Sequence, residues 1–67
     1  MSNQYVAIIT EAQAIELAGK EFAPDCYFNP VPYNGEWIIS KEEIDQCINE
    51  QYIWVKNLPL IPYEPVP

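Results

Sequence analysis

The chain has 67 residues and a formal net charge of −7, from ten acidic residues against three lysines, with no arginine and no histidine. This length allows one small domain, which buries roughly 60% of its unfolded surface and is marginally stable alone. The charge argues against a protein that grips phosphates with clustered Lys and Arg, so we expect no direct nucleic-acid binding. A hydrophobic content of 49% excludes a disordered tail.

The first predicted elements are a strand over residues 5–9 and a helix over residues 11–18. The strand segment, Tyr-Val-Ala-Ile-Ile, is apolar at every position, which is typical of a strand buried on both faces. Thr10 and Gln13 have the spacing of a capping box, and Gly19 follows the helix as a stop signal. The stripe expected to face the core consists of Ala14, Leu17 and Ala18.

The segment of residues 21–35 combines helix-breaking prolines with many aromatic residues. It is too apolar for a solvated loop, so we expect an ordered segment that packs its aromatic rings against the core. Asn34-Gly35 is the strongest turn dipeptide in the chain and predicts a tight hairpin into the next strand. The prolines limit that pairing to a sheet edge.

A second strand is predicted over residues 36–39 and a second helix over residues 41–49. Ser40 and Glu43 again have the spacing of a capping box. The inward stripe of this helix consists of Ile44, Cys47 and Ile48. Residues 52–56, Tyr-Ile-Trp-Val-Lys, have the β-branched and aromatic composition of a third strand.

These elements predict an α+β fold: a layer of about three strands (5–9, 36–39, 52–56) with two short helices (11–18, 41–49) on one face. Shifting the chain by thirty residues places Thr10 on Ser40 and Phe22 on Tyr52, with the helix stripes superposed. We therefore interpret the pattern as two β-α units. Capping boxes are common at helix starts, however, and produce a similar internal similarity without a duplication.

The last ten residues form a proline-rich apolar segment. Prolines recur every third residue at 59, 62 and 65, the period of a polyproline II helix. We expect a compact domain over residues 1–57 and an extended docking tail over residues 58–67. The tail either packs on its own domain or reaches a neighbouring subunit, and a third alternative is a ligand for an SH3-type groove.

Catalysis is poorly supported by the residue types present. The chain has no His, no phosphate-binding glycine loop, and no residue type suited to activate Cys26 as a nucleophile. Two cysteines without His do not complete a zinc site. We therefore expect no enzyme, no cofactor and no metal. The absence of a signal peptide or membrane-length apolar run favours a cytoplasmic protein with free thiols and no membrane partner.

The function that fits these features is a protein-interaction module. Two short helices cannot cover both faces of an aromatic sheet, and an uncovered apolar face marks a contact surface. We expect a subunit of a homo-oligomer or of a larger assembly such as a virion, acting through that face and the tail. The residues expected to contact the partner are Trp37, Tyr52, Trp54, Leu60, Ile61 and Tyr63.

The acidic balance offers an alternative function. An acidic surface can mimic nucleic acid and occupy the basic groove of a DNA- or RNA-binding protein. The short row of carboxylates that would carry this consists of Glu42, Glu43, Asp45 and Glu50. Mimicry predicts binding that weakens steeply with salt, whereas apolar docking predicts binding that salt barely changes.

Overall fold

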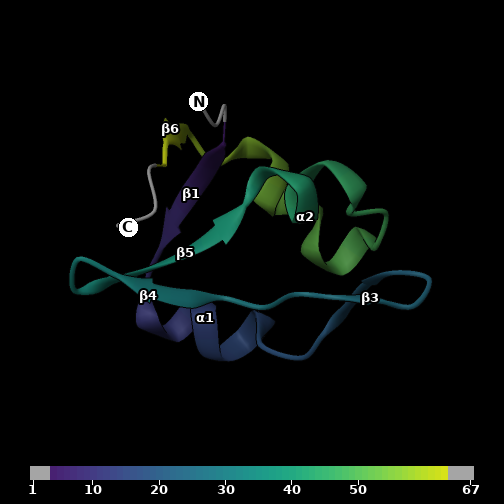
Figure 1. The fold of residues 1–67 in the computed structure, drawn as a ribbon. Coiled ribbons are helices and arrows are strands. Elements are labelled where there is room, and N and C mark those ends of the chain that lie inside the picture. Colours follow the sequence, from purple (N-terminus) through teal and green to yellow (C-terminus); the bar gives the residue numbers. More distant parts are fainter. Residues whose placement is uncertain (1–3, 64–67) are drawn as a thin grey trace.

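The structure is a computed structural model that describes residues 4–63, and Figure 1 shows the course of the chain. Its elements follow in this order: β1 (Tyr5–Ile9), α1 (Glu11–Leu17), β2 (Glu21–Ala23), β3 (Cys26–Tyr27), β4 (Val31–Tyr33), β5 (Glu36–Ser40), α2 (Lys41–Gln46), the 3₁₀ helix η1 (Glu50–Asn57) and β6 (Leu60–Pro62). Mixed helix and strand in one small domain confirm the predicted α+β class.

The main sheet has four antiparallel strands in the order β4-β5-β1-β6, and β2 and β3 form a separate two-stranded hairpin. In the centre, Ile8 of β1 lies opposite Ile38 of β5. β1 contacts β6 on its other side, where Val6 lies opposite Ile61. The first strand of the chain is therefore central, but the prediction that it is buried on both faces is wrong: Ala7 and Ile9 are buried under the helices, whereas Ile8 is 43% exposed on the other face.

The helices pack on one face of this sheet. Side chains alternate between the two faces of a strand, so Ala7 and Ile9 of β1 share a face with Ile39 of β5. These three join the buried core with Leu17 of α1 and Ile44 of α2. The prediction that both helices lie on the same side of the sheet is confirmed.

Both predicted capping boxes are present. The Thr10 hydroxyl accepts from the Gln13 N–H while the Gln13 side chain accepts from the Thr10 N–H, and Ser40 and Glu43 repeat this exchange. The helices end earlier than predicted, at Leu17 and Gln46.

Two residues of the predicted inward stripes are consequently misplaced. Ala18 caps α1 and is exposed, and Ile48 follows α2 with 66% of its surface exposed. Both residues lie after the last residue of their helix, so the helical period no longer directs their side chains toward the core.

The predicted strand over residues 52–56 is wrong, because these residues belong to η1. Tyr52 and Val55 are buried while Ile53 and Lys56 are exposed. This three-residue period of burial is that of a 3₁₀ helix. The composition favours a strand, but η1 packs against the core on the helix side, and none of the strands within residues 4–63 pairs with it.

The tight hairpin across Asn34-Gly35 is confirmed: Tyr33 lies opposite Glu36, and both turn residues have positive φ, 51° and 78°. Such a pair is typical of a type I′ turn, which Asn-Gly favours.

The tail differs from the polyproline expectation. Leu60–Pro62 is an edge strand paired with β1 of the same chain, so this part packs on its own domain. The remaining tail positions, residues 64–67, lie outside the described residues.

The topology has an approximate internal two-fold arrangement. Ile8 and Ile38, thirty residues apart, face each other at the centre of the sheet. Their strands are flanked symmetrically, β5 by β4 and β1 by β6. Each outer strand therefore pairs with the first strand of the opposite half of the chain. The pairing of β6 with β1 is shifted by two residues relative to the equivalent pairing of β4 with β5. A shift of two residues keeps equivalent side chains on the same face of the sheet.

Within residues 4–63, every helix is too short or too polar to cross a membrane. Cys47 is fully buried in the core, Cys26 is half-buried, and both are free thiols.

Candidate functional site

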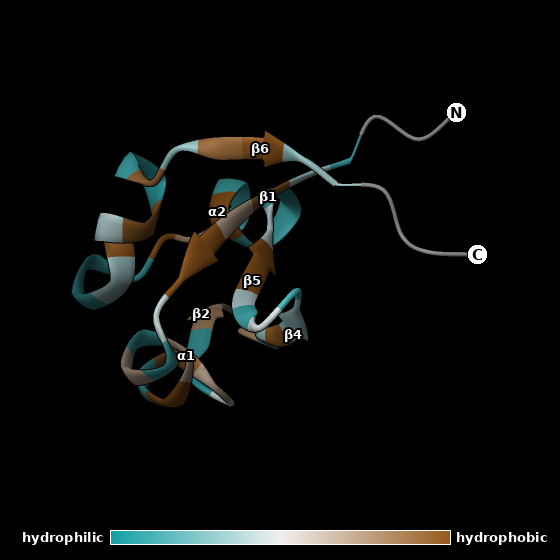
Figure 2. Ribbon diagram, turned by 90° about the vertical axis from the view of Figure 1, so that its left-hand side faces the viewer, coloured by the Kyte–Doolittle hydropathy of each residue, from teal (hydrophilic) through white to brown (hydrophobic). Residues whose placement is uncertain are grey.

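The face of the main sheet opposite the helices is the candidate site, and we call it the open face. It follows from the strand registers that seven apolar side chains point to this face: Val6, Ile8, Val31, Tyr33, Ile38, Ile61 and Tyr63. Hydropathy colouring shows that β1, β5 and β6 are largely hydrophobic (Figure 2). Both Val6 and Ile38 are buried, yet neither belongs to the core cluster under the helices. The open face therefore has a small apolar cluster of its own.

A tyrosine pair joins the two outer strands across the open face. Tyr33 ends β4 and Tyr63 follows β6, and their ring centroids are 5.0 Å apart with the planes at 63°. Because β5 and β1 separate these strands, the contact requires the sheet to curl toward the open face. This curvature makes the face concave.

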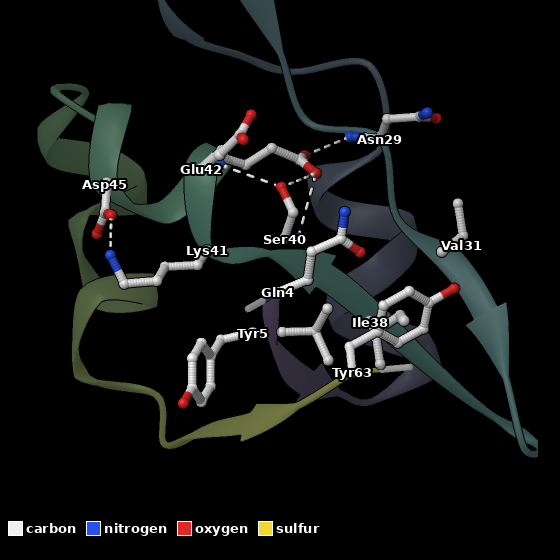
Figure 3. Close-up of a pocket in the computed structure, with 12 residues that line it drawn as sticks. Gln4, Tyr5, Asn29, Val31, Ile38, Ser40, Lys41, Glu42, Asp45 and Tyr63 are labelled. Carbon is white, nitrogen blue, oxygen red and sulfur yellow. Dashed lines mark hydrogen bonds and ion pairs between the residues drawn. The ribbon is translucent and has the colours of Figure 1, made fainter. Parts of the chain in front are cut away.

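A groove of about 410 Å³ lies in this concave face, beside the start of α2. Figure 3 shows the side chains that line it. Its apolar lining includes Val6, Val31, Ile38 and Tyr63, and its polar wall consists of Gln4, Asn29, Ser40 and four residues of α2, Lys41, Glu42, Glu43 and Asp45. The volume lies within the range of ligand-binding pockets, roughly 300–1,000 Å³. An apolar floor with a charged wall on one side is the main asymmetry of the site.

The carboxylates of the α2 wall have different partners. Glu43 accepts from the Ser40 N–H and hydroxyl through Oε1, and from the Asn29 N–H through Oε2 at 2.8 Å. Lys41 forms an ion pair with Asp45, and both side chains are about half exposed. Among the described residues, Glu42 makes no hydrogen bond or ion pair to another side chain. Within residues 4–63, Glu42 is therefore the one carboxylate of the α2 wall that no contact inside the protein uses.

The two edges of the sheet are poor templates for an added strand. Tyr33 and Glu36 flank a two-residue turn and form a hydrogen-bonded pair, so the nitrogen of Pro32 points outward from β4. The Tyr63 N–H donates to the Gln4 carbonyl at 2.9 Å, so the nitrogen of Pro62 points outward from β6. Proline has no N–H, and both edges lack a donor at these positions.

The predicted partner-binding residues are divided between the two faces. Tyr52 is 5% exposed within the helix-side core, and Trp37 and Trp54 are half-buried against the same core. Leu60 lies opposite Ala7 and so faces the helix side, whereas Ile61 and Tyr63 face the groove side. One sheet face is uncovered, as the sequence suggests, but it is not the tryptophan face.

The partner-binding residues predicted from the sequence do not include five residues of the open face: Val6, Ile8, Val31, Tyr33 and Ile38. A signal for them is present in β1, where both alternating sets of residues are apolar although the helices cover only one face. The involvement of Asn29 and Gln4 depends on pairing between distant segments, which no local pattern indicates.

The predicted acidic row is interrupted. Glu43 is part of the capping box, Asp45 is paired with Lys41, and Glu50 begins η1 rather than extending α2. Among residues 4–63, no three acidic or cysteine side chains are close enough to hold a metal ion. Comparison with protein-family models, with curated proteins and with solved structures finds no match to this chain.

Proposed function

We propose that this chain is a non-enzymatic protein-interaction module that works as a subunit of a larger assembly through its open face. The observation that carries the proposal is that the helices pack on one face only, while Ile8 and Val31 remain 43% and 40% exposed on the other. Contiguous exposed apolar surface on a small protein usually marks a contact site.

The partner proposed is a different protein rather than a second copy. Two copies would each bring a net charge of −7, and an acidic α2 wall borders the open face of each. Repulsion between like charges opposes such a dimer at low salt. The proposed setting is the cytoplasm or a larger particle.

The open face is tested by a pair of isoleucine and valine variants. Val31→Asp places a charge on the open face, whereas Ile15→Asp places the same charge on α1, where the native side chain is 71% exposed. We expect a protein captured by the tagged full-length chain, then purified and recombined with it, to bind Val31→Asp about ten-fold or more weakly. Binding to Ile15→Asp should be unchanged.

Equal binding by both variants would show that the open face is not the contact surface. The salt response distinguishes this function from nucleic-acid mimicry. A basic nucleic-acid-binding partner whose affinity falls steeply between low and physiological salt would favour the acidic mimic instead. Light scattering on the purified chain at tens of micromolar checks for self-association, and a stable dimer sensitive to Val31→Asp would replace the separate partner by a second copy.

A further inference from the structure

We propose that the groove of the open face receives a lysine or arginine side chain of the partner. The aliphatic part of that side chain lies over Val6, Val31 and Ile38, and its cationic end meets Glu42. This inference rests on the proposed function of the open face and specifies the chemistry of what binds there.

The shape of the groove fits a long amphipathic side chain. Its floor is aliphatic, with Val6 and Ile38 buried and Val31 partly exposed, and its charged wall lies along α2. In Figure 3, Val31, Ile38 and Tyr63 lie on the side of the site away from Lys41 and Asp45. Lysine and arginine place their methylene groups on apolar surface while the charged end stays in a polar environment.

The contacts of the α2 wall favour a positive charge on the side chain that enters the groove. Among residues 4–63, Lys41 is the only lysine that lines the groove, and its ammonium group forms an ion pair with Asp45. The Glu43 carboxylate receives donors on both oxygens. Of the three carboxylates that line the groove, Glu42 is the one left without such a partner within residues 4–63, and an incoming cation supplies it. An anionic side chain would meet a wall with net negative charge.

The proline edges favour recognition by side chains over recognition by backbone. An added strand needs N–H donors along an edge, and Pro32 and Pro62 remove them at outward-facing positions. A partner segment that crosses the open face does not need those donors. The affinity then depends on which side chains enter the groove.

The test uses the full-length chain labelled with ¹⁵N and three blocked tripeptides: acetyl-Leu-Arg-Leu-amide, acetyl-Leu-Gln-Leu-amide and acetyl-Leu-Glu-Leu-amide. Each peptide is titrated at low salt while amide shifts are followed at Val6, Val31, Ile38 and Glu42. We expect the arginine peptide to bind more tightly than the glutamine peptide by about two- to five-fold, the range of an exposed ion pair. The glutamate peptide should bind most weakly.

Matched variants assign the charge effect to one carboxylate. Glu42→Gln should reduce the preference for arginine over glutamine to about one. Glu11→Gln removes an equivalent charge from the first turn of α1 and should leave the preference unchanged. Because both side chains are exposed, both variants should keep the dispersed spectrum of the folded chain.

Two results would overturn the inference. If the arginine and glutamate peptides bind equally, the groove does not select a cation, although the open face can still be a contact surface by the Val31→Asp test. If no peptide shifts these four amides, and the purified partner shifts those of Ile8 and Tyr33 but not these four, the partner binds elsewhere on the open face. Loss of partner binding in Val31→Asp combined with an unchanged partner affinity in Glu42→Gln also separates the two proposals.

Discussion

The two halves of the chain, residues 5–33 and 36–63, build the same core from different side chains. Four buried positions of the first half have buried equivalents thirty residues later: Ile9 and Ile39, Ala14 and Ile44, Leu17 and Cys47, Phe22 and Tyr52. Phe28 links the halves, with ring centroids 4.6 Å from Phe22 and 5.9 Å from Tyr52. At these four pairs burial is shared by the halves, whereas side-chain size is not.

The exposed positions of the two helices differ much more than the buried ones. Residues 11, 12, 13 and 15 of α1 are Glu, Ala, Gln and Ile, and the equivalent residues of α2 are Lys, Glu, Glu and Asp. The groove lies beside α2. The core positions are therefore set by packing that is common to both halves, whereas the acidic wall of the groove belongs to the second half alone.

The largest expected difference between the halves concerns one equivalent pair of buried residues. Leu17→Ala removes most of a fully buried side chain and should reduce the free energy of unfolding by about 2–5 kcal/mol. Cys47→Ala removes one sulfur at the equivalent position and should cost about 1 kcal/mol, the scale of one buried methylene. Urea unfolding of both variants measures the difference. An equal or larger loss for Cys47→Ala would contradict it.

A smaller difference is expected between the two capping boxes. Glu43→Ala removes a charged acceptor used by Ser40 and Asn29, and should cost about 1.5–3 kcal/mol. Gln13→Ala removes a neutral acceptor used by Thr10 alone, and should cost about 0.5–1.5 kcal/mol. Thermal unfolding of both variants compares them.

The conservative exchange Gln13→Glu keeps the first box and should leave stability within about 0.5 kcal/mol, as surface substitutions usually do. If Glu43→Ala and Gln13→Ala prove equally destabilising, the bond from Asn29 contributes nothing measurable.

A third difference between the halves is expected at the turn after α1. Gly19 has φ of 75°, and a Cβ added there would meet nothing within 4 Å. The cost of Gly19→Ala is therefore conformational, about 1–2 kcal/mol. Gly19→Asn should cost less, because asparagine tolerates positive φ. The equivalent residue in the second half, Asn49, has φ of −79°, so only the first half needs this conformation. Urea unfolding of both variants that shows no loss would contradict the prediction.

The parts of the fold that the sequence predicts correctly depend on local contacts. The capping boxes join residues three apart, and the Asn34-Gly35 turn joins neighbours, so spacing and residue type suffice. The strand predicted over residues 52–56 was wrong because an apolar, β-branched composition suits a strand and a buried 3₁₀ helix equally. Tertiary packing decides between the two structures.

An uncovered sheet face was predicted from the sequence, but of its seven apolar residues only Ile61 and Tyr63 were named. Which face of β1 is uncovered depends on the position of the helices. The groove depends on the contact between Tyr33 and Tyr63. These residues are thirty positions apart, on strands that pair with opposite halves. No pattern within one segment encodes that geometry.

The exchange of outer strands between the halves has a consequence for the order in which the protein folds. β1 is synthesised before the other strands, yet β5 and β6, which flank it, begin only at residues 36 and 60. Until β6 is made, β1 has an unpaired edge, and apolar side chains on both of its faces are accessible to other chains. We therefore expect nascent chains that stop before residue 60 to be prone to aggregation, and the full chain to fold more slowly than a helical protein of its length.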